Sequence, residues 1–292
     1  MNLGIGLGLT NYLRVPTVAL DPDAAISELF RTGTPGVYYE GAWYDPSDLT
    51  TVWQDAAGTT PATAGDPVGR IDDKSGNGNH ATQSTATARP TLQTSGGLYY
   101  LDFDGVDDYL QGPTHPFTFT GPVSFYTGFS PTSTKVYSTL FSAGATTSGA
   151  SNQQKTMAFQ YSSSASIPGV NRPSFATDIW TPSGIYTSTT SPLVTGTDYV
   201  AGFVISNWST HRSSGTTARI NGGGQTISTY GPSDPTSLNA SPTYIGVFDP
   251  VALSTSFSDA NIYGMIVLDR TLTAGEIDDV EAYLAAKSGV TL

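Results

Sequence analysis

The feature that most constrains the fold of this chain is a long succession of short apolar segments separated by turn residues. Between residues 43 and 270 these segments alternate or run apolar, and Gly, Pro, Asn, Ser and Thr end each of them. Such short segments are typical of β-strands. The Asn221-Gly222 pair is a strong hairpin signal, because both residues tolerate positive φ. The predicted strands cover residues 98–103, 123–129, 157–161, 199–205, 217–222, 244–248 and 261–268.

The C-terminal segment departs from this pattern and predicts a helix. Thr273 and Glu276 have the spacing of a capping box, in which each side chain bonds the other residue's backbone N–H. Apolar residues then recur at helical spacing as far as Leu284, and Gly289 suits a C-terminal cap. We therefore expect one amphipathic helix to cover part of an otherwise all-β fold.

The strands predict an all-β fold in which two antiparallel sheets form a sandwich. Residues 1–40 differ from the rest, since they alternate Gly with Leu or Ile and then pass several prolines, with one short helical stretch at 23–30. We expect residues 1–40 to form an extended arm that packs on another chain, and residues 41–292 to form one sandwich domain. A frayed terminus is the alternative for the arm.

Composition excludes several classes of protein. Charged residues make up 12 % of the chain, its net charge is −12, and it has no Cys. The missing thiols exclude a disulfide scaffold, a zinc–thiolate site and an iron–sulfur protein. Nucleic acid needs a basic surface, which the sequence does not offer. No segment approaches the roughly 20 apolar residues of a membrane helix, and no signal peptide is recognisable.

One acidic string resembles the catalytic signature of sandwich-fold β-glucanases, which is E-x-D-x-x-E. It comprises Glu276, Asp278 and Glu281. Catalysis there needs two carboxylates on either side of a sugar bond, which alternate residues of a strand provide. A helix instead turns Glu276 and Asp278 about 200° apart. Because the capping box predicts a helix, we expect the string to be structural and the protein not to be an enzyme.

Three aspartates near a predicted turn could bind a hard cation. Asp104, Asp107 and Asp108 surround Gly105, and carboxylates with carbonyl oxygens are the ligands that Ca²⁺ prefers. The same residue types also favour a tight turn. The structural turn is the leading interpretation, with Ca²⁺ binding as the alternative and no other cofactor expected.

Aromatic residues beside turn residues are the candidates for sugar binding. Flat rings stack on pyranose rings, and such residues otherwise fill the ends of a sandwich core. The candidates are Trp180, Tyr186, Trp208 and Tyr230.

A set of longer strings resembles one family. They are Trp-Tyr-Asp-Pro-Ser-Asp-Leu at 43–49, Asp-Lys-Ser-Gly-Asn-Gly-Asn-His-Ala-Thr at 73–82 and Leu-Asp-Phe-Asp-Gly-Val-Asp-Asp-Tyr-Leu at 101–110. Together with residues 270–284 they resemble the concanavalin A-like (laminin-G-like) lectin/glucanase domain of tailed-bacteriophage virion proteins. The resemblance begins near Trp43 and is weakest between 112 and 215.

The resemblance implies a jelly-roll sandwich and a non-enzymatic structural role in a phage particle, as capsid decoration, neck or collar, or tail component. It further implies assembly in bacterial cytoplasm, attachment to other virion proteins through residues 1–40 and, by analogy with phage appendages, a homotrimer. A carbohydrate-binding adhesin that recognises host surface glycan is the first alternative. A glycan-degrading enzyme is the second.

Overall fold

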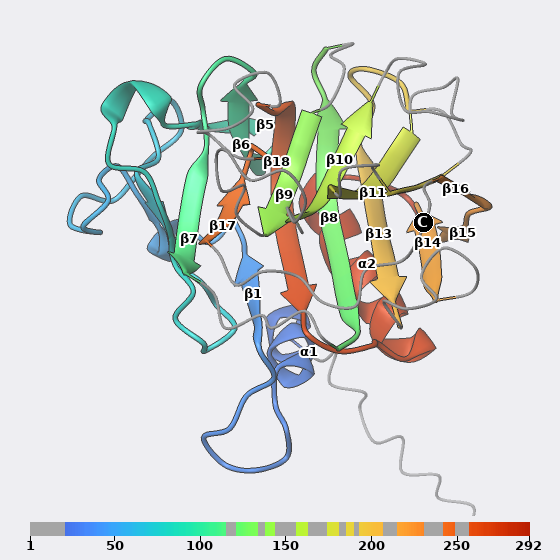
Figure 1. Cartoon of the computed structure of the whole chain (residues 1–292). Helices are drawn as coiled ribbons and strands as arrows, with labels where there is room; N and C mark the ends of the chain where they lie inside the picture. The colour runs from blue at the N-terminus through green and yellow to red at the C-terminus, as the bar shows by residue number, and fades with distance from the viewer. Residues whose placement is uncertain are drawn as a thin grey trace, which may run out of the picture.

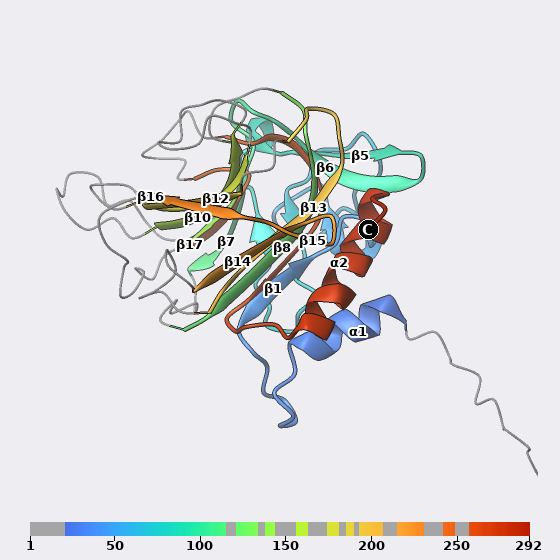
Figure 2. The same cartoon turned by 90° about the vertical axis from the view of Figure 1, so that its right-hand side faces the viewer.

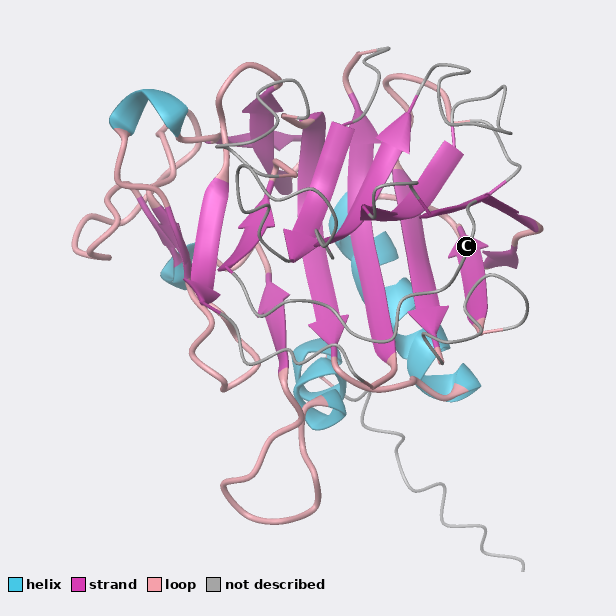
Figure 3. Ribbon diagram, in the orientation of Figure 1, coloured by secondary structure: helices cyan, strands magenta, loops and turns pink. Residues whose placement is uncertain are grey.

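The chain folds into two antiparallel β-sheets that pack face to face, as the sequence predicts (Figure 1, Figure 3). The computed structural model describes residues 21–114, 121–133, 138–143, 156–162, 174–180, 185–189, 193–206, 215–230, 242–248 and 257–292. A short helix near the start of these residues and a longer one at the C-terminus complete the fold. The expected mostly β, two-sheet class is therefore confirmed.

The first sheet has eight strands within the described residues. Its order is β15 (Gly223–Gly224), β14 (Thr216–Ile220), β13 (Tyr199–Ile205), β8 (Val123–Pro131), β18 (Asp259–Leu268), β6 (Leu98–Asp104) and β5 (Thr91–Ser95), and β1 (Gly41–Tyr44) also pairs with β18. The predicted turn at Asn221-Gly222 joins β14 to β15. Both residues have positive φ, 48° and 76°, so the hairpin prediction is confirmed.

The second sheet has ten strands within the described residues. Its order is β16 (Ile227–Tyr230), β12 (Ile185–Thr189), β11 (Ser174–Trp180), β10 (Thr156–Ser162), β9 (Ser138–Ala143), β17 (Pro242–Ile245), β7 (Leu110–Thr114), β4 (Ala81–Thr82), β3 (Arg70–Ile71) and β2 (Val52–Trp53). Two short 3₁₀ helices, Leu49–Thr51 and Ala86–Ala88, lie between the early strands.

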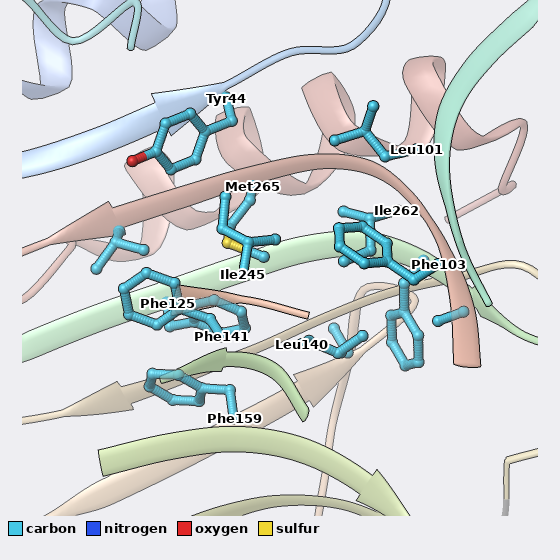
Figure 4. Packing of buried hydrophobic residues seen from close by; sticks show 14 of the residues in the cluster. Tyr44, Leu101, Phe103, Phe125, Leu140, Phe141, Phe159, Ile245, Ile262 and Met265 are labelled. Atoms are coloured by element: carbon cyan, nitrogen blue, oxygen red, sulfur yellow. The ribbon is translucent and has the colours of Figure 1, made fainter. Parts of the chain in front are cut away.

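The main core lies between the two sheets (Figure 4). Aromatic rings dominate it, and Phe125 of β8 stacks on Phe159 of β10 with ring centroids 3.9 Å apart. Phe103, Phe141 and Phe203 are also fully buried or nearly so. Burying such rings removes a large apolar area from water and so contributes strongly to the stability of this core.

A second core lies on the other face of the eight-stranded sheet, where helices α1 (Pro22–Leu29) and α2 (Ala274–Ser288) pack (Figure 2). Thr273 and Glu276 form the predicted capping box of α2, and Gly289 ends it at φ 75°. Residues of α2 such as Leu284 contact β-strand residues such as Ile266 in this core. Strand β8 is consequently buried on both faces, which explains why it lacks the alternation of a half-exposed strand.

The described part of the expected N-terminal arm packs on the sandwich. Ile26 and Phe30 are fully buried in the second core, beside α2 and Trp43. Residues 22–30 therefore belong with the body rather than with a separate arm, because an apolar helix face needs cover from water. Residues 31–40 form a projecting loop that leads into β1 (Figure 1). Residues 1–20 lie outside the described part of the chain.

The string at 73–79 forms a turn that fixes the start of β1. The Asp73 carboxylate accepts hydrogen bonds from the backbone N–H groups of Trp43, Ser75 and Asn79, each at 2.9 Å. The Asn79 amide in turn donates to the Gly41 carbonyl at 2.8 Å. These bonds satisfy buried backbone groups, so the string has a structural role in this turn.

The string at 43–49 supplies the centre of a buried charge network. Asp45 is only 1 % exposed, and its Oδ2 accepts from Tyr283 Oη at 2.7 Å, Lys287 Nζ at 3.0 Å and Lys74 Nζ at 3.2 Å. Lys74 also pairs with Asp23 of α1 at 2.6 Å. One carboxylate thus connects the two helices and the turn that follows β3.

Candidate functional site

One row of residues crosses the entire ten-stranded sheet. Backbone pairing aligns Trp53 with Arg70, Arg70 with Thr82, Thr82 with Gln111, and Gln111 with Tyr244. It then continues from Tyr244 through positions Ser142, Ala158, Asp178, Tyr186 and Tyr230. Directly paired positions lie on the same face of a sheet.

The first five members of this row, which we call the outer row, face away from the main core. Their neighbours along each strand are buried in that core: Val52, Ile71, Ala81, Leu110 and Ile245. Because successive side chains of a strand point to opposite faces, Trp53, Arg70, Thr82, Gln111 and Tyr244 must point outward. Gln111 is exposed and the other four are half-buried.

No described helix covers this outer face, in contrast to the face of the other sheet (Figure 2). Strands lie about 4.8 Å apart, so the outer row extends over roughly 19 Å from Trp53 to Tyr244. These five positions form a half-exposed surface that carries one indole, one phenol and three side chains able to form hydrogen bonds, whereas Ser142 and Ala158 farther along the row are buried.

Asp72 holds the Trp53 end of the outer row in place. Its Oδ2 accepts from Trp53 Nε1 at 2.8 Å, and its Oδ1 accepts from Arg70 Nε at 2.6 Å. The Arg70 and Asp72 side chains are 25 % and 22 % exposed. The indole and the guanidinium are thus oriented by one carboxylate while part of each stays open to solvent.

Two further aromatic side chains lie at the Tyr244 end. The rings of Tyr109 and Tyr244 pack edge to face with centroids 6.2 Å apart, and Phe257 lies 6.4 Å from Tyr109. The Tyr109 carbonyl accepts from the Gln83 amide at 3.1 Å. The Tyr244 ring is therefore packed against Tyr109, which in turn packs against Phe257.

The sequence-predicted aromatic residues are partly brought together. Tyr186 of β12 and Tyr230 of β16 occupy directly paired positions, in the same transverse row as Trp53 and Tyr244. Trp180 ends β11, where it pairs with Thr156 rather than with this row. Trp208 lies outside the described residues. Sugar binding by these four residues stays a prediction.

The outer row itself was not identified from the sequence, except that Tyr244 opens a predicted strand. Strands β2, β3 and β4 have two residues each, which is too short for alternation to be visible. The usable signal was at Tyr244-Ile245, where an aromatic residue precedes a buried aliphatic one. Alternation at that point already assigns the ring to the outer face.

The three predicted aspartates converge. Carboxylate oxygens of Asp104, Asp107 and Asp108 all lie within 4.8 Å of one another. Asp104 Oδ1 accepts from the Val106 N–H at 2.7 Å, and Asp108 Oδ2 accepts from the Asp104 N–H at 3.1 Å, as in an Asx-type turn. Burial, together with the charges of Asp104 and Asp107, raises the pKa of Asp108 to about 7. The Ca²⁺ alternative stays a prediction.

The glucanase-like string lies on α2, as predicted, and its glutamates are engaged in ion pairs. Glu281 is 1 % exposed and binds Arg219 of β14 through both carboxylate oxygens, with Nη2 at 2.8 Å. Glu276 pairs with Arg270 at 2.7 Å, and this hydrogen-bonded pair lowers its pKa to about 2. These contacts give both residues structural roles.

A hollow of about 630 Å³ lies between α1 and the projecting loop. Its polar lining consists mainly of the exposed Glu28–Arg31 pair and Thr34, with Tyr38 as its one aromatic side chain. It offers a sugar fewer aromatic and hydrogen-bonding groups than the outer row.

The described helices include none that is both long and apolar enough to cross a bilayer.

Comparison with solved structures finds several whose fold is similar to this two-sheet β-sandwich. It is similar to an arabinofuranosidase complexed with arabinofuranosyl-α-1,2-xylobiose, with TM-score 0.56 and 15 % identity, over 85 % of this chain and 62 % of that one. It is also similar to Trypanosoma rangeli sialidase in complex with sialic acid, with TM-score 0.52 and 14 % identity, over 91 % of this chain and 37 % of the sialidase.

A third similar structure is domain 4 of AbnA, an extracellular arabinanase from Geobacillus stearothermophilus, in complex with arabinotriose. The TM-score is 0.51 and the identity 15 %, over 83 % of this chain and 98 % of that domain. This chain therefore corresponds in extent to a whole domain of that enzyme, but only to part of the sialidase and of the arabinofuranosidase. No protein-family model matches the sequence. No curated protein matches it either.

Proposed function

We propose that this chain is a glycan-binding domain whose ligand lies on the outer row of the ten-stranded sheet. The observation that carries the proposal is the outer row itself, in which Trp53 and Tyr244 stand on a face that no described helix covers, with Arg70, Thr82 and Gln111 between them. Flat rings that stack on sugars and side chains that bond hydroxyls are the combination that sugar recognition needs.

The comparisons support an oligosaccharide as the class of ligand. The arabinanase domain was solved with arabinotriose, and this chain spans nearly all of that domain. A row of about 19 Å suits several linked sugars better than one, because each strand adds a contact position about 4.8 Å from the last. The proposal thus favours the carbohydrate-binding alternative drawn from the sequence.

The virion role expected from the sequence rests on the family resemblance. The relatives described above are carbohydrate-active enzymes and one of their domains, so they lend it no support. A glycan-binding domain displayed on a phage particle would be consistent with both the proposed function and the expected virion role. Localising this chain in an intact phage particle is the experiment that tests the virion placement.

Binding of the chain to a glycan panel tests the proposed function, with the affinity for the best ligand measured by calorimetry. We expect Trp53→Ala to weaken binding about tenfold or more, because stacking on an indole is lost. Trp53→Phe keeps a ring, loses the bond to Asp72, and should retain most of the affinity.

Tyr38→Ala is the matched control, since Tyr38 is 41 % exposed on the projecting loop and away from the outer row. Its affinity should equal that of the wild type. The proposal would be contradicted by a wild-type chain that binds no member of the panel, or by a Trp53→Ala variant that folds and binds normally.

A further inference from the structure

Arg70 is the basic residue of the outer row, and its side chain is 25 % exposed. Its guanidinium takes part in hydrogen bonds with described residues only through Nε, which donates to Asp72 Oδ1 at 2.6 Å. Neither Nη1 nor Nη2 has a partner among these residues. Arg89, by contrast, donates from Nε, Nη1 and Nη2 to three backbone carbonyls, at 3.0 Å each.

The guanidinium is also held in position rather than free to move. Asp72 fixes Nε, and the side-chain stem lies against the backbone of Gly58, where a Cβ atom would be 3.3 Å from Arg70 Cδ. The side chain is 25 % exposed, and it stands between Trp53 and Thr82 in the outer row. The guanidinium therefore lies on the same face of the sheet as the indole.

We propose that Arg70 recognises a carboxylate on the bound glycan, so that the ligand of the outer row carries an acidic sugar next to the sugar that stacks on Trp53. A planar carboxylate accepts two parallel N–H bonds from an arginine fork, and such charge-assisted pairs are stronger than neutral ones. The inference rests on the proposed function and adds the chemical class of the ligand.

The net charge of −12 further restricts which acidic glycans can bind. A polyanion would be repelled by the chain as a whole, whereas one isolated carboxylate can accept from the Nη1 and Nη2 groups of Arg70. The ligand class is therefore an oligosaccharide with a single acidic sugar among neutral ones.

Matched pairs of oligosaccharides that differ only in the acidic group test this inference. Suitable probes are 3′-sialyllactose against lactose, and xylotetraose with one glucuronic acid substituent against plain xylotetraose. We expect the acidic member of at least one pair to bind about tenfold or more tightly, as one charge-assisted pair allows. Sulfolactose is a third probe, which carries a tetrahedral sulfate in place of a planar carboxylate and so tests which kind of anion Arg70 recognises.

Variants at Arg70 connect this preference to the guanidinium. Arg70→Gln should abolish the preference, because it should weaken binding of the acidic member far more than binding of the neutral member, and Arg70→Lys should retain part of it, because an ammonium cannot form the fork. Arg31→Gln is the matched control: Arg31 is 59 % exposed, pairs with Glu28 through Nε, and lies on the projecting loop. It should keep the full preference.

Three outcomes would overturn the inference. If both members of each pair bind equally, and only Trp53→Ala weakens them, the glycan-binding function stands and the role of Arg70 is refuted. If the preference that depends on Arg70 appears only with sulfolactose, the anion is not a carboxylate. If the wild-type chain binds no probe and no member of the wider panel, the proposed function fails as well.

Discussion

Two buried aspartates illustrate how partners decide the state of a carboxyl group. Burial alone would raise the pKa of Asp45, but hydrogen bonds from Ser47 and Tyr283 and the charges of Lys287 and Lys74 outweigh it and lower the pKa to about 2. Asp108 is also buried, yet its neighbours are other carboxylates, and its pKa rises to about 7. The same residue type is thus a stable anion in one place and a proton-binding group in the other.

The pH dependence of stability should reveal Asp108. Its pKa is about 7 in the folded chain and 3.8 in a model peptide, so the folded chain holds this proton more tightly. The contribution of this proton to the free energy of unfolding is therefore fully present below about pH 4 and is lost as the pH rises through about 7. We expect Asp108→Asn, which keeps an acceptor for the Asp104 N–H, to be more stable than the wild type at pH 8, by on the order of 1–3 kcal/mol.

Urea unfolding at pH 5 and pH 8 measures this difference. An Asp108→Asn variant that loses as much stability between these pH values as the wild type would refute the assignment. Repeating the unfolding at pH 8 with calcium chloride tests whether the three aspartates bind Ca²⁺. If Ca²⁺ binds the three aspartates, it should raise the midpoint of the wild type but not that of the variant.

At the scale of elements, the second core explains why a short helix near the N-terminus is ordered. α1 has eight residues, which is too short to be stable alone. Asp21 caps its first turn by accepting from the Asp23 N–H at 3.1 Å, and Arg270 donates to the Leu29 carbonyl at its end. Its stability comes from packing on α2 and on the sheet rather than from propensity.

Removing the Phe30 ring tests this packing. The Phe30 side chain is fully buried in the second core, so Phe30→Ala should lower the free energy of unfolding by about 3–5 kcal/mol. Denaturant unfolding measures the change. Val37→Ala is the control, since Val37 is 50 % exposed on the projecting loop, and it should change stability by less than about 0.5 kcal/mol. Equal effects of the two changes would mean that α1 does not belong to the body.

At the scale of the whole molecule, the network around Asp45 joins segments far apart in the sequence. Lys287 and Tyr283 reach it from the C-terminal helix, and Lys74 connects it to Asp23 of α1. Lys74 also lies 4.5 Å from the centre of the Trp43 ring. The two helices are thereby tied to the sandwich by charge as well as by apolar contact.

Removing the central charge should be costly. Asp45→Asn leaves Lys287 without its carboxylate partner, and breaking a buried ion pair from one side costs about 3–5 kcal/mol. Thermal and urea unfolding at pH 7 measure the loss. Asp279→Asn is the control, because Asp279 is exposed on α2. A variant at Asp45 as stable as this control would show that the network contributes nothing to the fold.

Much of the architecture follows from local signals in the sequence. The strand pattern between residues 43 and 270, the Asn221-Gly222 hairpin and the capping box at Thr273 are each confirmed. These features depend on neighbours within a few residues, and the physics of φ angles and of helix ends acts over that range. The helical geometry of the acidic string follows from the same capping box.

The candidate site and the N-terminal helix depend instead on contacts between distant segments. Trp53, Arg70, Thr82, Gln111 and Tyr244 come from five strands, and nothing local shows that their positions pair. Burial of Phe30 likewise requires α2, which lies at the other end of the chain. The sequence by itself determined that short strands, turns and a C-terminal helix would form, because backbone preferences are local. Only the tertiary structure decided which face stays open and which residues meet on it, since strand register is set by the packing of both sheets around one core.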